Sequence, residues 1–114
     1  MTESSNVPAF EGIMVPMVTP LLSNGELDKK GVERVVKHLA NGGVQGIFIL
    51  GTTGEAASLK PAIKKDLIEI SCKEANGKTP VFVGITHTSL EVSLKLARSA
   101  KENGAVAVVA ALPY

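Results

Sequence analysis

The sequence predicts an α/β fold built on a parallel β-sheet, and two observations support this. Continuous apolar runs alternate along the 114 residues with amphipathic helical patterns, which is the order typical of βα units. The apolar runs show no strand-like alternation of polar and apolar residues, as expected for strands that are covered on both faces. The predicted strands are residues 12–19, 46–50, 80–85 and 105–112.

Two of the connecting segments carry helix start and stop signals. The first helix is expected to begin after Asp28, an N-cap residue, and to end at Asn41. Its apolar stripe is Val32, Val35, Val36, Leu39 and Ala40. The second helix is expected to begin near Pro61 and to end before Asn76. Its apolar stripe is Ile63, Leu67 and Ile70.

The third connecting segment predicts a helix that ends before Asn103. Its start is a capping-box pattern in which Thr88 is the N-cap and Glu91 the third helical residue. We expect the helix to bury Leu94 and Ala97, with Leu90 and Ala100 beside them. Three helices would then separate the four strands.

The closed (β/α)8 barrel is the favoured version of this architecture. The first predicted strand lacks the Gly-x-Gly-x-x-Gly turn of a dinucleotide site. A barrel has eight strands and about 250 residues, so four strands would form a half-barrel. We therefore expect residues 1–114 to form part of a single barrel domain, with residues 1–10 as a polar arm. A flavodoxin-like open sheet that binds phosphate at residues 51–55 is an alternative.

Composition and charge exclude several classes of partner. A net charge of +1 with scattered charges gives neither a basic stripe for nucleic acid nor a cationic amphipathic helix for a membrane surface. The N-terminus has no signal-peptide pattern and no apolar run is long enough to span a bilayer, so we expect a cytoplasmic protein. The single Cys72 has no metal-ligand spacing around it and is expected to be structural.

The segment Gly51-Thr52-Thr53-Gly54-Glu55 is the strongest candidate for a functional site. It lies between a predicted buried strand and a predicted helix. Glycines there allow a sharp turn, and backbone N–H groups and threonine hydroxyls can bind a small carboxylate or phosphate. The alternative is a plain turn in which the glycines satisfy the backbone geometry and the threonines cap the next helix.

The carboxyl ends of the other strands are predicted to meet this segment at the same edge of the sheet. They carry Val18-Thr19-Pro20, Thr86-His87-Thr88 and Pro113-Tyr114. Hydroxyls and one imidazole are therefore expected at the mouth of the barrel, where the carboxyl ends of the strands meet. No carboxylate pair or metal-ligand cluster is expected there. We expect neither a metal nor a cofactor.

Five segments give the chain a family resemblance. They are residues 12–20, 24–28, 51–59 and 80–84, and Gly104-Ala105 leading to Pro113-Tyr114. Together they resemble the dihydrodipicolinate synthase and N-acetylneuraminate lyase family. The resemblance implies a TIM-barrel class I aldolase, usually tetrameric, that joins pyruvate to an aldehyde or imine, or splits such products, through a Schiff base to a lysine. A homo-oligomer, tetramer or dimer, is therefore expected for the full-length protein.

The resemblance also implies roles for individual residues. Thr53 and its backbone N–H would hold the pyruvate carboxylate, with Gly51 and Thr52 beside it. The hydroxyl of Thr52 would belong to a proton relay. Tyr114 aligns with the first tyrosine of the family's Pro-Tyr-Tyr segment and is expected at an interface or at the mouth, where His87 is also placed.

No lysine of this chain fits the Schiff-base role, because all ten are predicted on polar helix faces or in loops. The family's lysine comes from a later strand, so the resemblance implies that residues 1–114 are the N-terminal portion of a single TIM-barrel domain and are inactive alone. Unpaired strand edges rich in valine and alanine are expected to make the free chain prone to self-association. The Thr-Thr pair favours the dihydrodipicolinate synthase branch. The alternatives are the N-acetylneuraminate lyase or 2-keto-3-deoxy sugar-acid aldolase branch, and a non-catalytic half-barrel that serves binding or assembly.

Overall fold

The computed structural model describes residues 11–112, and these form a parallel sheet with the strand order β1-β2-β3-β4. The strands are β1 (Met14–Pro16), β2 (Gly46–Ile49), β3 (Val81–Gly84) and β4 (Ala107–Val109). Each lies within its predicted apolar run, so the positions of the strands are confirmed, although all four are shorter than predicted. The sequential order excludes the flavodoxin-like alternative, in which the second strand precedes the first across the sheet.

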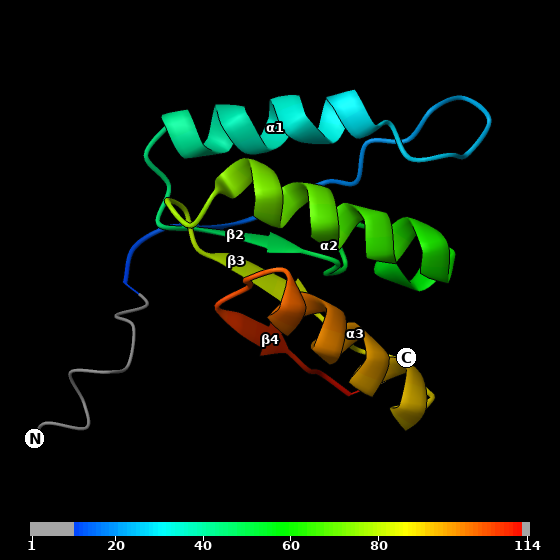
Figure 1. Ribbon diagram of the computed structural model, residues 1–114. Helices are drawn as coiled ribbons and strands as arrows, with labels where there is room; N and C mark the ends of the chain where they lie inside the picture. The colour runs from blue at the N-terminus through cyan, green and yellow to red at the C-terminus, as the bar shows by residue number, and fades with distance from the viewer. Residues whose placement is uncertain (1–10, 113–114) are drawn as a thin grey trace, which may run out of the picture.

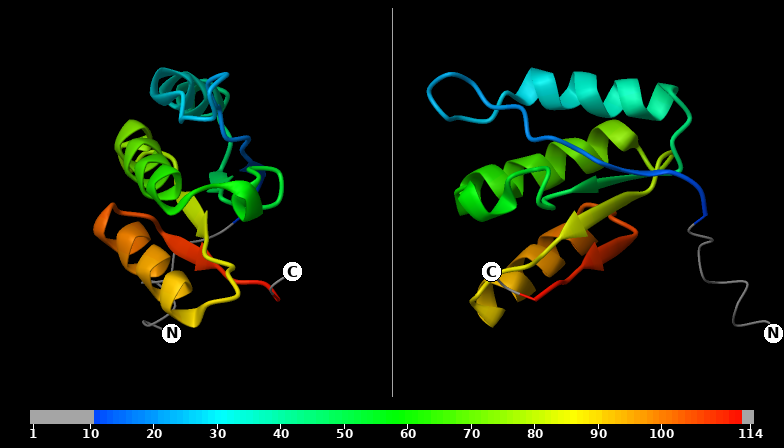
Figure 2. Two further views of the ribbon diagram at one scale, coloured as in Figure 1. Left: turned by 90° about the vertical axis from the view of Figure 1, so that its right-hand side faces the viewer. Right: turned by 180° about the vertical axis from the view of Figure 1, so that it is seen from behind.

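Three α-helices, α1 (Lys29–Asn41), α2 (Pro61–Ala75) and α3 (Leu90–Glu102), connect the strands. A short 3-10 helix, η2 (Ala56–Ser58), precedes α2. All three α-helices lie on one face of the sheet, and the opposite face is open among the described residues (Figures 1 and 2). None of the helices described over residues 11–112 has the length and apolar character needed to cross a membrane.

The ends of α1 and α2 follow their local sequence signals. The Asp28 side chain accepts a hydrogen bond from the N–H of Gly31 at 2.9 Å and caps α1, as predicted. Pro61 is the first residue of α2, where the missing N–H of proline costs nothing. Asn76 ends the helix in the left-handed conformation with φ 50°.

The predictions for α3 were wrong in two respects. The N-cap is Ser89, whose hydroxyl accepts from the N–H of Val92, and Thr88 lies outside the helix. The buried face carries Leu96 and Ala100, whereas Leu90 and Leu94 are 73% and 45% exposed. The helix has two apolar stripes, and the one that begins with Val92 faces the sheet. Only the burial of Ala100 is confirmed.

In α2 the buried face is also turned relative to the prediction. Leu67 is fully buried as expected, but Ile63 and Ile70 are only partly buried. The residues buried with Leu67 are Lys64, Ile68, Ser71, Cys72 and Ala75. The placement of Lys64 on a polar face was therefore wrong.

The core lies between the helices and one face of the sheet. Ile47, Ile49 and Val83 are fully buried there. Phe48 alternates with Ile47 and Ile49 and is only partly buried, because it belongs to the open face, where it pairs in register with Phe82 of β3.

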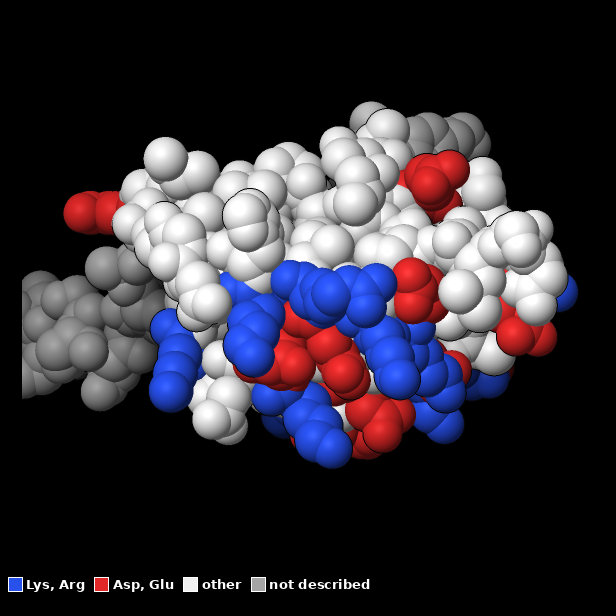
Figure 3. All heavy atoms as spheres, turned by 90° about the horizontal axis from the view of Figure 1, so that it is seen from above, with Lys and Arg blue, Asp and Glu red and all other residues white. Residues whose placement is uncertain are grey.

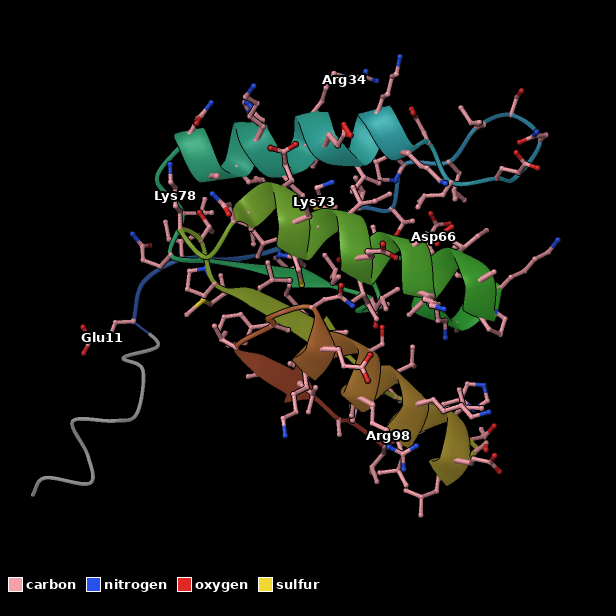
Figure 4. All side chains as sticks on the ribbon, viewed as in Figure 1. Glu11, Arg34, Asp66, Lys73, Lys78 and Arg98 are labelled. Carbon is pink, nitrogen blue, oxygen red and sulfur yellow. The ribbon has the colours of Figure 1, made fainter. Side chains whose placement is uncertain are left out.

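Charged side chains of both signs gather on the helix side of the molecule, and the remainder of the surface in this view is largely uncharged (Figure 3). Arg34, Asp66, Lys73 and Arg98 are examples from the three helices (Figure 4). The helices thus present a charged outer surface, whereas the open face of the sheet carries the paired Phe48 and Phe82.

Candidate functional site

The segment 51–55 leaves the sheet at the carboxyl end of β2, where the sequence predicted it. The chain turns at Leu50, which is buried and has a positive φ of 60°. A left-handed conformation is unusual for a leucine and costs about 1 kcal/mol or more. The carbonyl of Leu50 packs so closely on Gly84 of β3 that a Cβ there would overlap it. The end of β3 therefore makes room for the turn that begins the segment.

A tight turn closes the segment. The N–H of Glu55 donates to the carbonyl of Thr52 at 3.0 Å, and the N–H of Ala56 donates to the carbonyl of Gly51 at 3.3 Å. Thr53 and Gly54 occupy the two central positions of this turn. Within residues 11–112, neither of their N–H groups has a hydrogen-bond acceptor. Neither donor is used by another described residue; Thr53 is exposed, whereas Gly54 is buried.

Thr19 holds the turn from the end of β1. Its hydroxyl donates to the carbonyl of Gly54 at 2.6 Å, and its side chain is buried. The prediction of hydroxyls at the mouth was therefore wrong for Thr19, because this hydroxyl is used inside the structure.

A cavity of about 180 Å³ lies beside the turn, on the open face of the sheet at the carboxyl ends of β2, β3 and β4. Two residues of the predicted site, Gly51 and Thr52, line it. Its full lining is Phe48, Leu50, Gly51, Thr52, Ala56, Gly84, Thr86, Val109 and Ala111. Thr53 is exposed and does not line this cavity. The hydroxyl of Thr86 accepts a hydrogen bond from the N–H of Ala111 at 3.0 Å.

His87 lies in a different cavity, of about 260 Å³, on the helix side of the sheet. This cavity is lined by Ala57, Leu59, Pro61, Lys64, Thr86, His87, Thr88, Val92 and Leu96. The Nδ1 atom of His87 accepts a hydrogen bond from the N–H of Ser89 at 2.9 Å, just before α3. The structure therefore does not bring His87 together with Thr52, although Thr86 borders both cavities. Tyr114 lies outside the described residues.

Lys64 is the unexpected residue of this second cavity. Only 6% of its surface is exposed, and burial lowers the pKa of its amine below the ordinary value of 10.5. Its side chain has no ion pair or hydrogen bond within residues 11–112. None of the ten lysines, all of which the structure describes, lines the cavity beside Thr52.

Other reactive groups are not assembled into a site. Burial raises the pKa of the Cys72 thiol from 9.0 to about 11, so the thiol is protonated and unreactive at neutral pH. Over residues 11–112, no three His, Cys, Asp or Glu side chains come together in a way that could hold a metal ion.

The model of the dihydrodipicolinate synthetase family matches residues 9–114. The chain belongs to this family. It is 39% identical over 105 residues to the 4-hydroxy-tetrahydrodipicolinate synthase of Thermotoga neapolitana, an alignment that covers 92% of this chain and 35% of the relative. The chain therefore spans about a third of the length of the curated relative it matches.

Solved structures of the family superpose closely on the described fold. Dihydrodipicolinate synthase from Bacteroides thetaiotaomicron is 46% identical with a TM-score of 0.89, over 96% of this chain and 36% of that one. A prophage protein of Escherichia coli K12 from the dihydrodipicolinic acid synthase family, solved in complex with pyruvate, is 30% identical with a TM-score of 0.88, over 94% and 36%. N-acetylneuraminate lyase from Mycoplasma synoviae is 36% identical with a TM-score of 0.86, over 92% and 36%. The predicted fold class, a (β/α)8 barrel of which this chain forms about half, is confirmed.

Two residues of the site, Thr19 and Gly84, were not predicted to support the turn. Thr19 was noted only as a hydroxyl near the mouth, and Gly84 only as the end of an apolar run. The sequence signal for both was their place at the carboxyl ends of β1 and β3, next to the segment they support.

Proposed function

We propose that the protein is a pyruvate-dependent class I aldolase or lyase resembling 4-hydroxy-tetrahydrodipicolinate synthase, and that residues 51–55 hold the carboxylate of the keto acid. The observation that carries the proposal is the pair of N–H groups, of Thr53 and Gly54, that have no acceptor within residues 11–112. Backbone donors fixed in a turn bind a carboxylate at little entropic cost. The pyruvate complex of the Escherichia coli family member supports the choice of ligand.

In the proposed mechanism, the turn fixes the carboxylate so that the keto carbon lies over the open face of the sheet. A neutral lysine amine attacks that carbon, water leaves, and an imine forms. The departing oxygen needs a proton, and the hydroxyl of Thr52, which lines the adjacent cavity, belongs to the relay that supplies it. A hydroxyl suits this task because it accepts one proton as it donates another.

The lysine of this step is proposed to come from a later strand of the full-length barrel, as the family resemblance implies. Lys64 is the only buried lysine among those described, but it lines the cavity on the helix side of the sheet. The 114 residues alone are therefore proposed to bind the keto acid without forming an imine.

The test is a titration of the 114-residue chain with pyruvate, followed by the amide signals of Thr53 and Gly54 in NMR spectra. We expect these two amides to shift with pyruvate and not with acetone, which has the carbonyl but lacks the carboxylate. Thr53→Val removes the hydroxyl at nearly constant shape and is expected to weaken binding about threefold to tenfold. Amides that do not respond to saturating pyruvate would contradict the proposed site.

Borohydride reduction in the presence of pyruvate tests the missing lysine. We expect a trapped adduct on the full-length protein and none on the 114-residue chain. An adduct on the short chain would contradict the assignment of the lysine to a later strand, and peptide mapping would identify the lysine used. A full-length protein that binds pyruvate without being trapped would favour the alternative of a non-catalytic binding or assembly module.

The N-acetylneuraminate lyase branch is a second candidate, because a lyase of that name superposes on the chain with a TM-score of 0.86. The same carboxylate site would serve both branches, and the partner of pyruvate would differ. Release of pyruvate from N-acetylneuraminate by the full-length protein would favour this branch. Formation of 4-hydroxy-tetrahydrodipicolinate would favour the first. The sugar-acid aldolase alternative would be favoured by pyruvate release from a 2-keto-3-deoxy sugar acid.

We also propose that the full-length protein is a cytoplasmic homo-oligomer. The family resemblance carries this part of the proposal, and sedimentation equilibrium of the full-length protein tests the oligomeric state.

A further inference from the structure

We infer that Thr19 is a positioning residue for keto-acid binding: its buried hydroxyl fixes the turn that presents the N–H groups of Thr53 and Gly54. The inference rests on the proposed function. Thr19 is 5% exposed and does not line the cavity beside Thr52, so it acts through the turn and without contacting the ligand.

The peptide unit between Gly54 and Glu55 is held at both ends. Its carbonyl accepts the hydrogen bond from the Thr19 hydroxyl at 2.6 Å. Its N–H, that of Glu55, donates to the carbonyl of Thr52 at 3.0 Å. Two hydrogen bonds on opposite sides of one planar unit fix the orientation of that plane. The backbone that precedes it, which carries the two free donors, is then anchored as well.

The Thr19 end of this connection is itself fixed to the sheet. The N–H of Met17 donates to the carbonyl of Phe48 in β2 at 2.8 Å, and Met17 is buried. Gly54 packs closely on the same segment, since a Cβ there would lie 3.0 Å from the carbonyl oxygen of Met17 and 3.3 Å from the hydroxyl of Thr19. The turn thus rests directly on the backbone that leaves β1, and the hydroxyl of Thr19 joins the two.

This arrangement predicts that the hydroxyl of Thr19, and not its size, controls the turn. Thr19→Val keeps the shape of the side chain and removes the donor, whereas Thr19→Ser keeps the donor. Thr79→Val is the matched control. Thr79 is similarly buried at 6%, but it precedes β3 and therefore lies at the amino ends of the strands, away from the turn. Thr19→Ala serves as the second donor-free variant if Thr19→Val does not fold.

The experiment measures hydrogen exchange of the Glu55 amide and the affinity for pyruvate in the 114-residue chain and these variants. With Thr19→Val we expect Glu55 to exchange about tenfold faster and pyruvate to bind about tenfold more weakly, while exchange in α1 is unchanged. Thr19→Ser and Thr79→Val are expected to match the wild-type chain at Glu55 and in pyruvate affinity.

Two results would overturn the inference. One is a Glu55 amide that stays equally protected in Thr19→Val, and the other is a loss of protection without any loss of pyruvate affinity. A wild-type chain that binds no pyruvate would contradict the proposed function. The exchange rates alone would then decide whether Thr19 holds the turn.

Discussion

Lys64 shows how a single residue can depart from the pattern of its helix. It lies on the buried face of α2, on the same stripe as Leu67 and Ser71. The hydroxyl of Ser71 is fully buried and has no hydrogen-bond partner within residues 11–112. The long apolar stem of a lysine can fill such a position, but its ammonium then loses water without gaining an anion. The buried face of α2 therefore carries two polar groups that oppose folding.

Replacing Lys64 with methionine is expected to stabilise the chain by about 1 kcal/mol at pH 7, because the stem volume stays and the charge goes. Burial lowers the pKa of Lys64 in the folded state below the 10.5 of the unfolded chain. Between these two values the unfolded chain binds more protons, so the free energy of unfolding of the wild-type chain rises with pH. The advantage of Lys64→Met should therefore shrink as pH approaches 10.5.

Urea unfolding followed by circular dichroism at several pH values measures this effect. Lys65→Met is the matched control, since Lys65 is the exposed neighbour in the same helix and should change stability by less than about 0.5 kcal/mol. A Lys64→Met variant that is less stable than wild type at pH 7 would show that the amine makes a favourable interaction.

At the scale of elements, the end of β3 and the exit from β2 depend on each other. The left-handed Leu50 carries the chain out of β2, and its carbonyl occupies the space in which Gly84 would otherwise have a side chain. The two strands are paired in register up to Ile49 and Val83, immediately before this contact. The position of the candidate site is therefore set by a strand that contributes no ligand-binding group of its own in the proposal.

Gly84→Ala is expected to destabilise the chain by about 2 kcal/mol or more, because the new methyl group overlaps the backbone of Leu50 and the strands must separate to admit it. The NMR signals of residues 50–55 should shift most. Gly42→Ala is the control: Gly42 ends α1 with φ −74°, and an added Cβ there would make ordinary contacts at 3.4 Å. Equal stability of the two variants in urea would contradict this account.

The elements that the sequence predicted well are those whose signals are local. Asp28 and Pro61 start helices through their own backbone and side-chain chemistry, so their neighbours in the sequence are sufficient to identify them. The buried face of α3 was missed because the helix has two apolar stripes of similar strength. Contact with the sheet selects the stripe of Leu96 and leaves Leu94 exposed, and periodicity alone cannot show that choice.

In the candidate site, too, the local signals could be read from the sequence, whereas contacts between distant residues could not. The turn of residues 51–55 was predicted from its own glycines and threonines. Its support was not, because Thr19 and Gly54 are separated by 35 residues and meet only when the strands pair. Lys64 was predicted on the polar face of its helix because charged residues are ordinarily exposed, and its own sequence neighbours do not show that it is buried.

At the scale of the whole molecule, the described residues form two unlike surfaces. The helix side carries most of the charge in Figure 3, and large apolar side chains are exposed in or beside both edge strands. Leu90 and Leu94 of α3 are also exposed. Val108 in the edge strand β4 is 43% exposed and Ile13 beside β1 is 67% exposed. Unpaired strand edges with apolar side chains favour pairing with other chains.

We therefore expect the 114-residue chain to self-associate, with an average mass in sedimentation velocity that rises with concentration. Val108→Lys places a charge on the β4 edge and should reduce association. Lys95→Met, on the charged helix side, is the comparison that should not reduce it. A soluble monomer at every concentration would contradict this expectation.

The sequential strand order has a consequence for how the chain is made. Each strand pairs only with the strand before it and the strand after it in the sequence, for example Met14 with Gly46 and Phe82 with Ala107. During synthesis, β1, α1 and β2 can therefore pack together as soon as they leave the ribosome, and each later βα unit adds to an edge that is already formed. The growing end always exposes the newest strand, so every completed unit provides the template for the next.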